Sequence, residues 1–121
     1  MPLSYRSLFY FESATAILLE IKRLDLPGEQ DPNKLYHWLM FDKATGTLHP
    51  QDFVSMQAGA EVQEREFRQG RLRFTEQSAT YVAHATGQAL ELAAAQPAQL
   101  PAALAQAIEA YLATLQPGSP R

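Results

Sequence analysis

The sequence contains no cysteine, and this absence excludes several kinds of chemistry. Without a thiol there can be no disulfide framework, no cysteine nucleophile and no cysteine-ligated zinc. Small secreted domains usually depend on disulfides, so the absence favours an intracellular protein, and we expect a cytoplasmic one. The first residues also lack the basic start, apolar stretch and small-residue cleavage site of a signal peptide.

Long apolar runs and an excess of positive charge are also missing. The longest apolar run near the N-terminus, residues 16–19, is far shorter than the roughly 20 residues that span a bilayer. The chain has 10 Lys and Arg against 13 Asp and Glu, for a net charge of −3. Phosphate contacts require clustered positive charge. We therefore expect neither a membrane nor a nucleic acid as a partner.

Sequence motifs that mark cofactor or metal sites are absent as well. The chain has no Gly-x-Gly-x-x-Gly, Walker loop, Gly-x-Ser-x-Gly or His-Glu-x-x-His. Its three histidines, His37, His49 and His84, do not have the i, i+4 spacing that a helical metal site uses. We expect no cofactor and no metal.

The residues that are present predict one domain. A chain of 121 residues with 46% apolar content can bury one core without a disulfide or a metal. Pro117 and Gly118 open a short run of tail-like residues. We therefore assign residues 1–116 to a single α+β domain and residues 117–121 to a flexible tail.

The end of the domain has the periodicity of an amphipathic helix. Pro101 suits a first helical turn, and alanine fills most of the following positions. Apolar residues recur there at steps of four, four, three and four, at Leu100, Leu104, Ile108, Tyr111 and Leu115. One apolar stripe with few charges predicts a helix that packs on a sheet or on a partner.

Residues 64–74 alternate as a half-buried hairpin. With Gln69-Gly70 as a two-residue turn, Phe67, Leu72 and Phe74 share one face. The opposite face is then charged, and consists of Glu64, Glu66, Arg68, Arg71 and Arg73.

Residues 81–94 allow a second hairpin around Gly87-Gln88, because a Gly-first turn suits type II′ geometry. Tyr81, Leu90 and Leu92 would then share a face with Ala83 and Ala85. In this register, His84 lies opposite Glu91. Residues 89–95 are rich in helix formers, so a helix there is the alternative.

The N-terminal half offers further strands. The apolar run 35–41 precedes the turn Asp42–Gly46 and a shorter strand from Thr47, although a helix capped by Asp31 with Pro32 at its first position also fits. Residues 14–24 fit a strand or a helix, and we favour the strand. The fold class is thus α+β, an antiparallel, curved β-meander sheet from residue 6 to about residue 94 with the C-terminal helix on one face.

Two of these strands are apolar on both faces. Phe9 and Phe11 alternate with Tyr10, and Tyr36 and Trp38 alternate with Leu35, Leu39 and Phe41. A strand of this kind is covered on both sides, which one helix cannot easily do. Either the sheet curls round its own core or a second subunit covers it. This is our reason for expecting a homodimer, whose commonest symmetry is twofold.

Two pairs of residues are weak candidates for acid–base catalysis. His84 beside Glu91 is the arrangement of a general base, although a surface ion pair is the more common outcome. His37 with Asp42 is the second pair. On a strand His37 shares the face of Leu39 and Phe41, which favours a hydrogen-bonded histidine at the core or its rim.

Four arginines, Arg65, Arg68, Arg71 and Arg73, fall within nine residues. Acidic neighbours and the hairpin register favour a solvated charged face over a nucleic-acid surface. Contact with an anion by Arg68 and Arg71 remains a narrower alternative.

The function that the sequence favours is non-catalytic binding. We expect a homodimeric module for a protein partner or an apolar small molecule. Tyr, Trp and Arg are enriched at binding hot spots, so the expected binding residues are Tyr10, Tyr36, Trp38, Arg68 and Arg71. One alternative is a small acid–base or isomerase-like enzyme with a His–carboxylate pair in a sheet–helix pocket. Another is an interaction protein of the kind of a bacterial secretion chaperone or an inhibitor, using the helix or an uncovered sheet edge.

Overall fold

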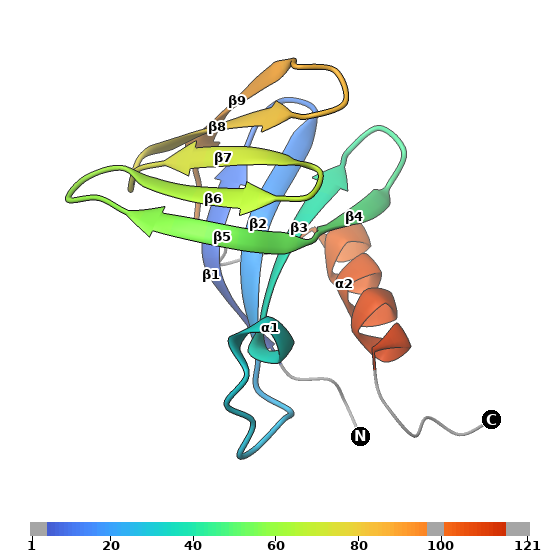
Figure 1. The fold of residues 1–121 in the computed structure, drawn as a ribbon. Coiled ribbons are helices and arrows are strands. Elements are labelled where there is room, and N and C mark those ends of the chain that lie inside the picture. The colour runs from blue at the N-terminus through green and yellow to red at the C-terminus, as the bar shows by residue number, and fades with distance from the viewer. Residues whose placement is uncertain (1–4, 97–100, 116–121) are drawn as a thin grey trace.

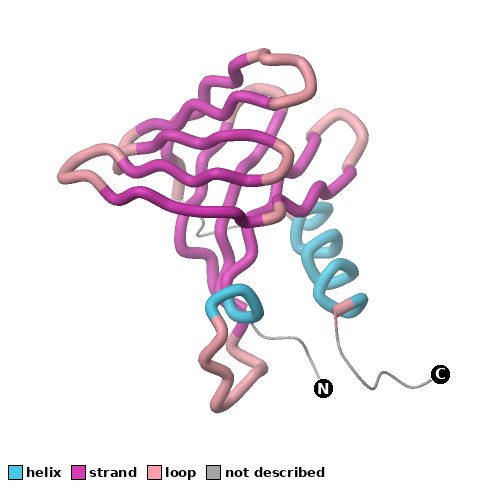
Figure 2. Tube along the Cα trace, viewed as in Figure 1, coloured by secondary structure: helices cyan, strands magenta, loops and turns pink. Residues whose placement is uncertain are grey.

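The computed structural model describes residues 5–96 and 101–115. This part of the chain folds into nine strands and two helices and is mostly β (Figures 1 and 2). In chain order the elements are β1 (Tyr5–Glu12), β2 (Ala16–Arg23), α1 (Pro32–Leu35), β3 (Tyr36–Asp42), β4 (Thr47–Gln51), β5 (Phe53–Ala58), β6 (Gln63–Phe67), β7 (Gly70–Phe74), β8 (Ser78–Ala83), β9 (Ala89–Ala94) and α2 (Ala102–Thr114).

All nine strands of the described chain form one antiparallel sheet in the order β4-β3-β2-β1-β9-β8-β7-β6-β5. This order joins two meanders, β1–β4 and β5–β9, through a pairing of β1 with β9. The expected single meander is therefore wrong in one respect, because β4 and β5 follow one another in the chain but lie at opposite edges of the sheet. Only Asp52 separates these two strands. The sheet consequently curls until its edges approach, and the result is nearly a barrel (Figure 1).

The curl creates a core on each face of β1–β3. The helix-side core contains Ile17, Leu19 and Ile21 of β2 together with Leu104 and Ile108 of α2. The inner core lies within the curled sheet and consists of Phe11, Leu18, Trp38, Phe67, Leu72, Phe74, Ala79, Tyr81 and Leu92. The curled sheet and α2 thus cover both faces of these strands within one chain. The apolar faces are therefore no longer a reason to expect a homodimer, and homodimerisation stays a prediction.

Helix α2 lies outside the curled sheet, beside β3 and β4 (Figure 1). Leu104, Ile108 and Leu112 are fully buried in it, at a regular spacing of four residues. The predicted apolar stripe is right for Leu104 and Ile108. It is wrong at its end, where Leu112 is buried and Leu115 is exposed. Tyr111, three residues after Ile108, lies at the edge of this stripe and is half-buried. Leu100 and the predicted tail 117–121 lie outside the described residues.

The first predicted hairpin has the right faces and the wrong partners. Phe67, Leu72 and Phe74 are buried as expected. However, Arg71 pairs with Glu66, so the register differs by two residues from the expected one. Gly70 is the first residue of β7, where a Cβ would overlap the ring of Tyr81. Glycine at this position therefore permits close packing and does not form the tight turn we predicted.

The second predicted hairpin is also formed by strands, and the alternative helix over 89–95 is wrong. Tyr81 pairs with Leu90, and Val82 pairs with Ala89. The loop between the strands is thus longer than a two-residue turn, and the register differs by four residues from the expected one. An even difference keeps each side chain on its face, so Tyr81 and Leu92 are buried as predicted.

The two alternatives for residues 31–41 are both present in part. Asp31 caps the one-turn helix α1 by accepting a hydrogen bond from the Asn33 backbone N–H at 3.0 Å, with Pro32 in the first turn. The predicted strand β3 follows directly. Residues 16–23 form the favoured strand, and Asp42 accepts from the Ala44 N–H at 2.8 Å in the predicted turn.

Candidate functional site

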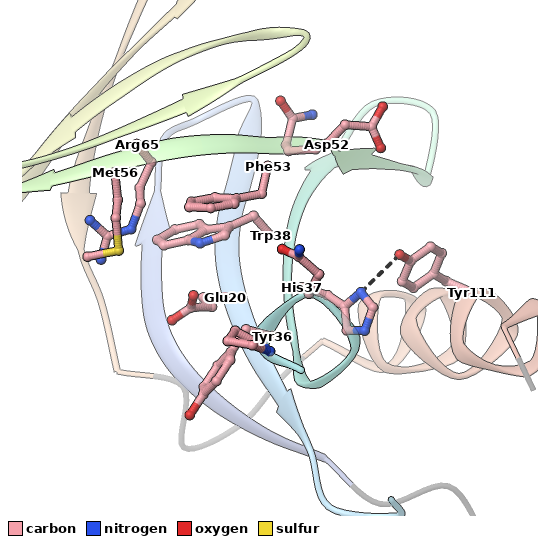
Figure 3. A pocket seen from close by; sticks show the side chains of 12 residues that line it. Glu20, Tyr36, His37, Trp38, Asp52, Phe53, Met56, Arg65 and Tyr111 are labelled. Atoms are coloured by element: carbon pink, nitrogen blue, oxygen red, sulfur yellow. Dashed lines mark hydrogen bonds between the residues drawn. The ribbon is translucent and has the colours of Figure 1, made fainter. Parts of the chain in front are cut away.

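A pocket of about 510 Å³ opens where the barrel fails to close, between β5 on one side and β2 and β3 on the other (Figure 3). Helix α1 and helix α2 complete its walls. We call it the seam pocket, and its volume is typical of small-molecule sites. It is lined by Glu20, Pro32, Asn33, Tyr36, His37, Trp38, Gln51, Asp52, Phe53, Met56, Arg65 and Tyr111.

The aromatic wall of the seam pocket is fixed by the inner core. Trp38 is only 4% exposed, and its ring stacks on Phe9 with centroids 5.8 Å apart. Its ring also packs at tilted angles against Phe67 and Phe74. Tyr36, on the same face of β3, and Phe53 of β5 are more exposed at the mouth. The wall therefore combines a rigid indole with two accessible rings.

Glu20 is the carboxylate of the seam pocket. It lies in the middle of β2 and pairs with Trp38 in the register of β2 and β3. The residue is 9% exposed. Burial raises the pKa of Glu20 to about 7, although the charge of Arg65 and hydrogen bonding from Trp38 act in the opposite direction. At neutral pH the carboxyl group is thus divided between its protonated and ionised forms.

Arg65 is the cation of the seam pocket. It is 8% exposed on the inner face of β6, and its guanidinium lies 5.1 Å from the Phe74 ring centroid and 6.0 Å from that of Trp38. It donates hydrogen bonds to the Gln63 Oε1 at 2.9 Å and the Glu64 carbonyl oxygen at 3.1 Å. Burial lowers the pKa of Arg65 from its ordinary value.

Sequence reasoning missed both charged residues of the seam pocket, although strand alternation contained the signal. Glu20 alternates with Leu19 and Ile21, so it shares the inner face with Leu18. Arg65 shares the face of Phe67 by the same rule, yet we grouped it with the solvent-facing arginines. Alternation alone does not show that the two strands face one another across a hollow.

His37 lies at the rim of the seam pocket and is half-buried. Its Nε2 N–H donates to the Lys34 carbonyl oxygen at 3.1 Å, and its Nδ1 accepts from the Tyr111 hydroxyl at 3.2 Å. The carbonyl can only accept, which assigns the proton to Nε2. Burial is the main cause that lowers the pKa of His37. The predicted hydrogen-bonded rim histidine is confirmed.

The predicted pair of His37 with Asp42 is not formed. The two residues stand five positions apart on β3, which separates them by roughly 17 Å along the strand. An odd separation also places them on opposite faces of the sheet. The Asp42 carboxylate instead accepts from backbone N–H groups of its own turn.

The predicted pair of His84 with Glu91 is not formed either, because of the register change in that hairpin. Glu91 pairs with Thr80 and accepts from its hydroxyl at 2.8 Å. His84 instead donates from Nε2 to the Glu66 carboxylate at 2.6 Å. Arg71 and then His84 lower the pKa of Glu66 in this exposed cluster, which lies outside the seam pocket.

Of the five expected binding residues, Tyr36 and Trp38 line the seam pocket. Tyr10 is buried in the helix-side core. Arg68 and Arg71 are exposed, and Arg71 forms an ion pair with Glu66 at 2.9 Å. The structure therefore brings two of the five together and separates the other three from them.

Over residues 5–96 and 101–115, no three His, Cys, Asp or Glu side chains are grouped as a metal site would require. Neither helix in that part of the chain is long and apolar enough to cross a membrane. Comparison with known proteins finds no matching family model, no similar curated protein and no similar solved structure.

Proposed function

We propose that the protein binds a small organic molecule with a flat apolar part in the seam pocket. The observation that supports this most is the combination of an aromatic wall with two buried charged side chains, Glu20 and Arg65, in one open cavity. Burying a charge is costly unless it is paired, and among the ion pairs of the described residues none joins these two. Few, well-placed polar groups in an apolar pocket are typical of ligand sites.

The proposal is tested by native mass spectrometry of protein purified from its expression host without denaturation. We expect a 1:1 adduct that is lost in Tyr36→Ala, which removes an exposed ring from the pocket mouth. The matched control is Val54→Ala on β5, an exposed residue outside the pocket lining. An adduct that survives in Tyr36→Ala, or that disappears equally in both variants, would contradict the proposed site. The mass of the intact species in the same spectrum shows whether the protein is a homodimer.

Acid–base catalysis is the second candidate. The observation that favours it is a carboxyl group, Glu20, that is 9% exposed and lines an open pocket, where burial raises its pKa to about 7. A carboxyl group with a pKa near 7 in a cleft can both donate and accept a proton at neutral pH. Glu20 would then take the role that we predicted for a His–carboxylate pair. The test is deuterium incorporation into the native ligand in D₂O. Catalysis requires incorporation with the wild-type protein and none with Glu20→Gln.

A further inference from the structure

Two arginines of the described chain are almost fully buried, and only one of them forms an ion pair with a carboxylate. Arg23 is 5% exposed, and both its Nε and its Nη2 donate to the Asp25 carboxylate, at 3.1 and 2.8 Å. Arg65 is 8% exposed and donates to a side-chain amide oxygen and a backbone carbonyl oxygen. The same fold thus neutralises one buried guanidinium with a bidentate ion pair and leaves the other facing a pocket.

The position of the Arg65 guanidinium suits an anion beside an aromatic surface. The rings of Phe74 and Trp38 lie beside it, with centroids 5.1 and 6.0 Å away. Two of its five N–H groups are used in the hydrogen bonds to Gln63 and Glu64, which leaves others for a ligand. Arginine is the side chain best matched to a planar carboxylate, because two parallel N–H donors fit the two oxygens.

We propose that the ligand of the seam pocket is a carboxylic acid with an aromatic or similarly flat apolar body, bound as its carboxylate by Arg65 and by the protonated form of Glu20. The proposal rests on the proposed function and names its ligand class. The apolar body lies along Trp38 towards Tyr36 and Phe53. The Glu20 O–H donates to one ligand oxygen, and protonation removes the negative charge that Glu20 would otherwise place beside the ligand. Binding therefore takes up one proton from solvent whenever Glu20 starts ionised.

Other titratable groups face the same pocket and must be separated from Glu20. They are Tyr36 and His37 of β3, Asp52 between β4 and β5, and Tyr111 of α2. His37 is neutral above pH 7, because burial lowers its pKa from the ordinary 6.5. Burial raises the pKa of Tyr111. The isosteric change Glu20→Gln removes the proposed proton uptake and leaves all four groups in place.

The test uses three matched probes, 3-phenylpropanoate, 3-phenylpropanamide and 3-phenylpropylamine, titrated into the full chain. Trp38 is the only tryptophan, so a single indole N–H signal in a ¹H–¹⁵N spectrum reports on the pocket. We expect the carboxylate to bind at least about tenfold more tightly than the amide at pH 6.5, and the amine to bind least, since charge-assisted hydrogen bonds exceed neutral ones.

Affinity for the carboxylate should fall by about tenfold per pH unit above pH 7, because the protonated fraction of Glu20 falls at that rate. Glu20→Gln should bind the carboxylate with no such slope. Arg65→Met, which keeps an unbranched apolar stem, should weaken carboxylate binding by about 10- to 100-fold and leave amide binding unchanged. The control Arg68→Met, on the exposed side of the same segment, should change neither.

Equal affinity for the carboxylate and the amide would overturn this inference and leave the proposed function standing. The same holds if the slope with pH persists in Glu20→Gln. If none of the three probes shifts the Trp38 signal, both the inference and the proposed function are overturned. A folded state of each variant is checked in the same spectrum, and if Arg65→Met does not fold, Glu20→Gln and the probe series still decide the matter.

Discussion

The two faces of strand β2 provide a comparison within one element. Ile17, Leu19 and Ile21 face α2 in a core that is made of buried apolar side chains. Leu18 and Glu20 face inward, where the same strand meets aromatic rings and the seam pocket. One face therefore serves packing alone, while the other combines packing with an accessible polar site. A fold of this size can keep buried charge on one side because the opposite side supplies apolar burial.

The largest effect is expected where the packing is tightest. Leu19→Ala removes a fully buried side chain from the helix-side core, and we expect a loss of about 2–5 kcal/mol in the free energy of unfolding. The measurement is urea denaturation followed by circular dichroism. The indole signal of Trp38 should respond to the phenyl probes as in wild type, because Leu19 points away from the pocket. A change in probe affinity as large as that of Arg65→Met would mean that the two faces are not independent.

The polar residue on the inner face, Glu20, should make the free energy of unfolding depend on pH. The raised pKa of Glu20, from 4.5 to about 7, means that the folded state holds a proton that the unfolded state releases. This contribution to stability is complete below pH 4.5 and is lost as pH rises through about 7, by up to about 3 kcal/mol. Urea denaturation at pH 5, 6, 7 and 8 should show this slope in wild type, and Glu20→Gln should flatten it. If Glu20→Gln has the same slope as wild type, the pH dependence of stability comes from another residue.

His37 contributes to the same pH profile in the other direction. Its folded pKa is lowered, so its contribution to stability is lost as pH falls below about 6.5. Tyr111→Phe removes the hydroxyl that donates to Nδ1, and should cost about 1 kcal/mol and raise the pKa of His37 in an NMR titration. Tyr36→Phe is the matched control, an exposed tyrosine whose hydroxyl loss should leave both quantities unchanged. A Tyr111→Phe variant with an unshifted His37 would show that the hydrogen bond is not formed in solution.

The smallest effect on stability is expected at the exposed edge of the sheet. Val54 of β5 is 60% exposed, so Val54→Lys should change the free energy of unfolding by no more than about 0.5 kcal/mol. The same change adds charge to an edge strand, Phe53–Ala58, that has none, and edges of that kind promote strand-to-strand association. If the predicted homodimer forms through this edge, sedimentation velocity will show Val54→Lys as a monomer. A dimer that survives the substitution would move the interface to another surface.

Sequence alone determined which face of most strands each residue occupies, and it located the turn at Asp42–Gly46 and the helix cap at Asp31. Alternation placed Phe67, Leu72, Phe74 and Tyr81 in the core, and Asp31 with Pro32 marked a helix start, because these signals act over a few neighbouring residues. Both hairpin registers were wrong by an even number, since a two-residue period records the face and does not record the partner.

Only the tertiary structure decided that β1 pairs with β9, that the sheet curls until β4 and β5 approach, and that Glu20 meets Arg65 across a hollow. β1 and β9 lie far apart in the chain, as do Glu20 and Arg65, so no local period links them. Their meeting depends on the closure of the whole sheet, which is set by burial of the inner core and by the cover that α2 provides. The candidate site exists because that closure stops short at one seam.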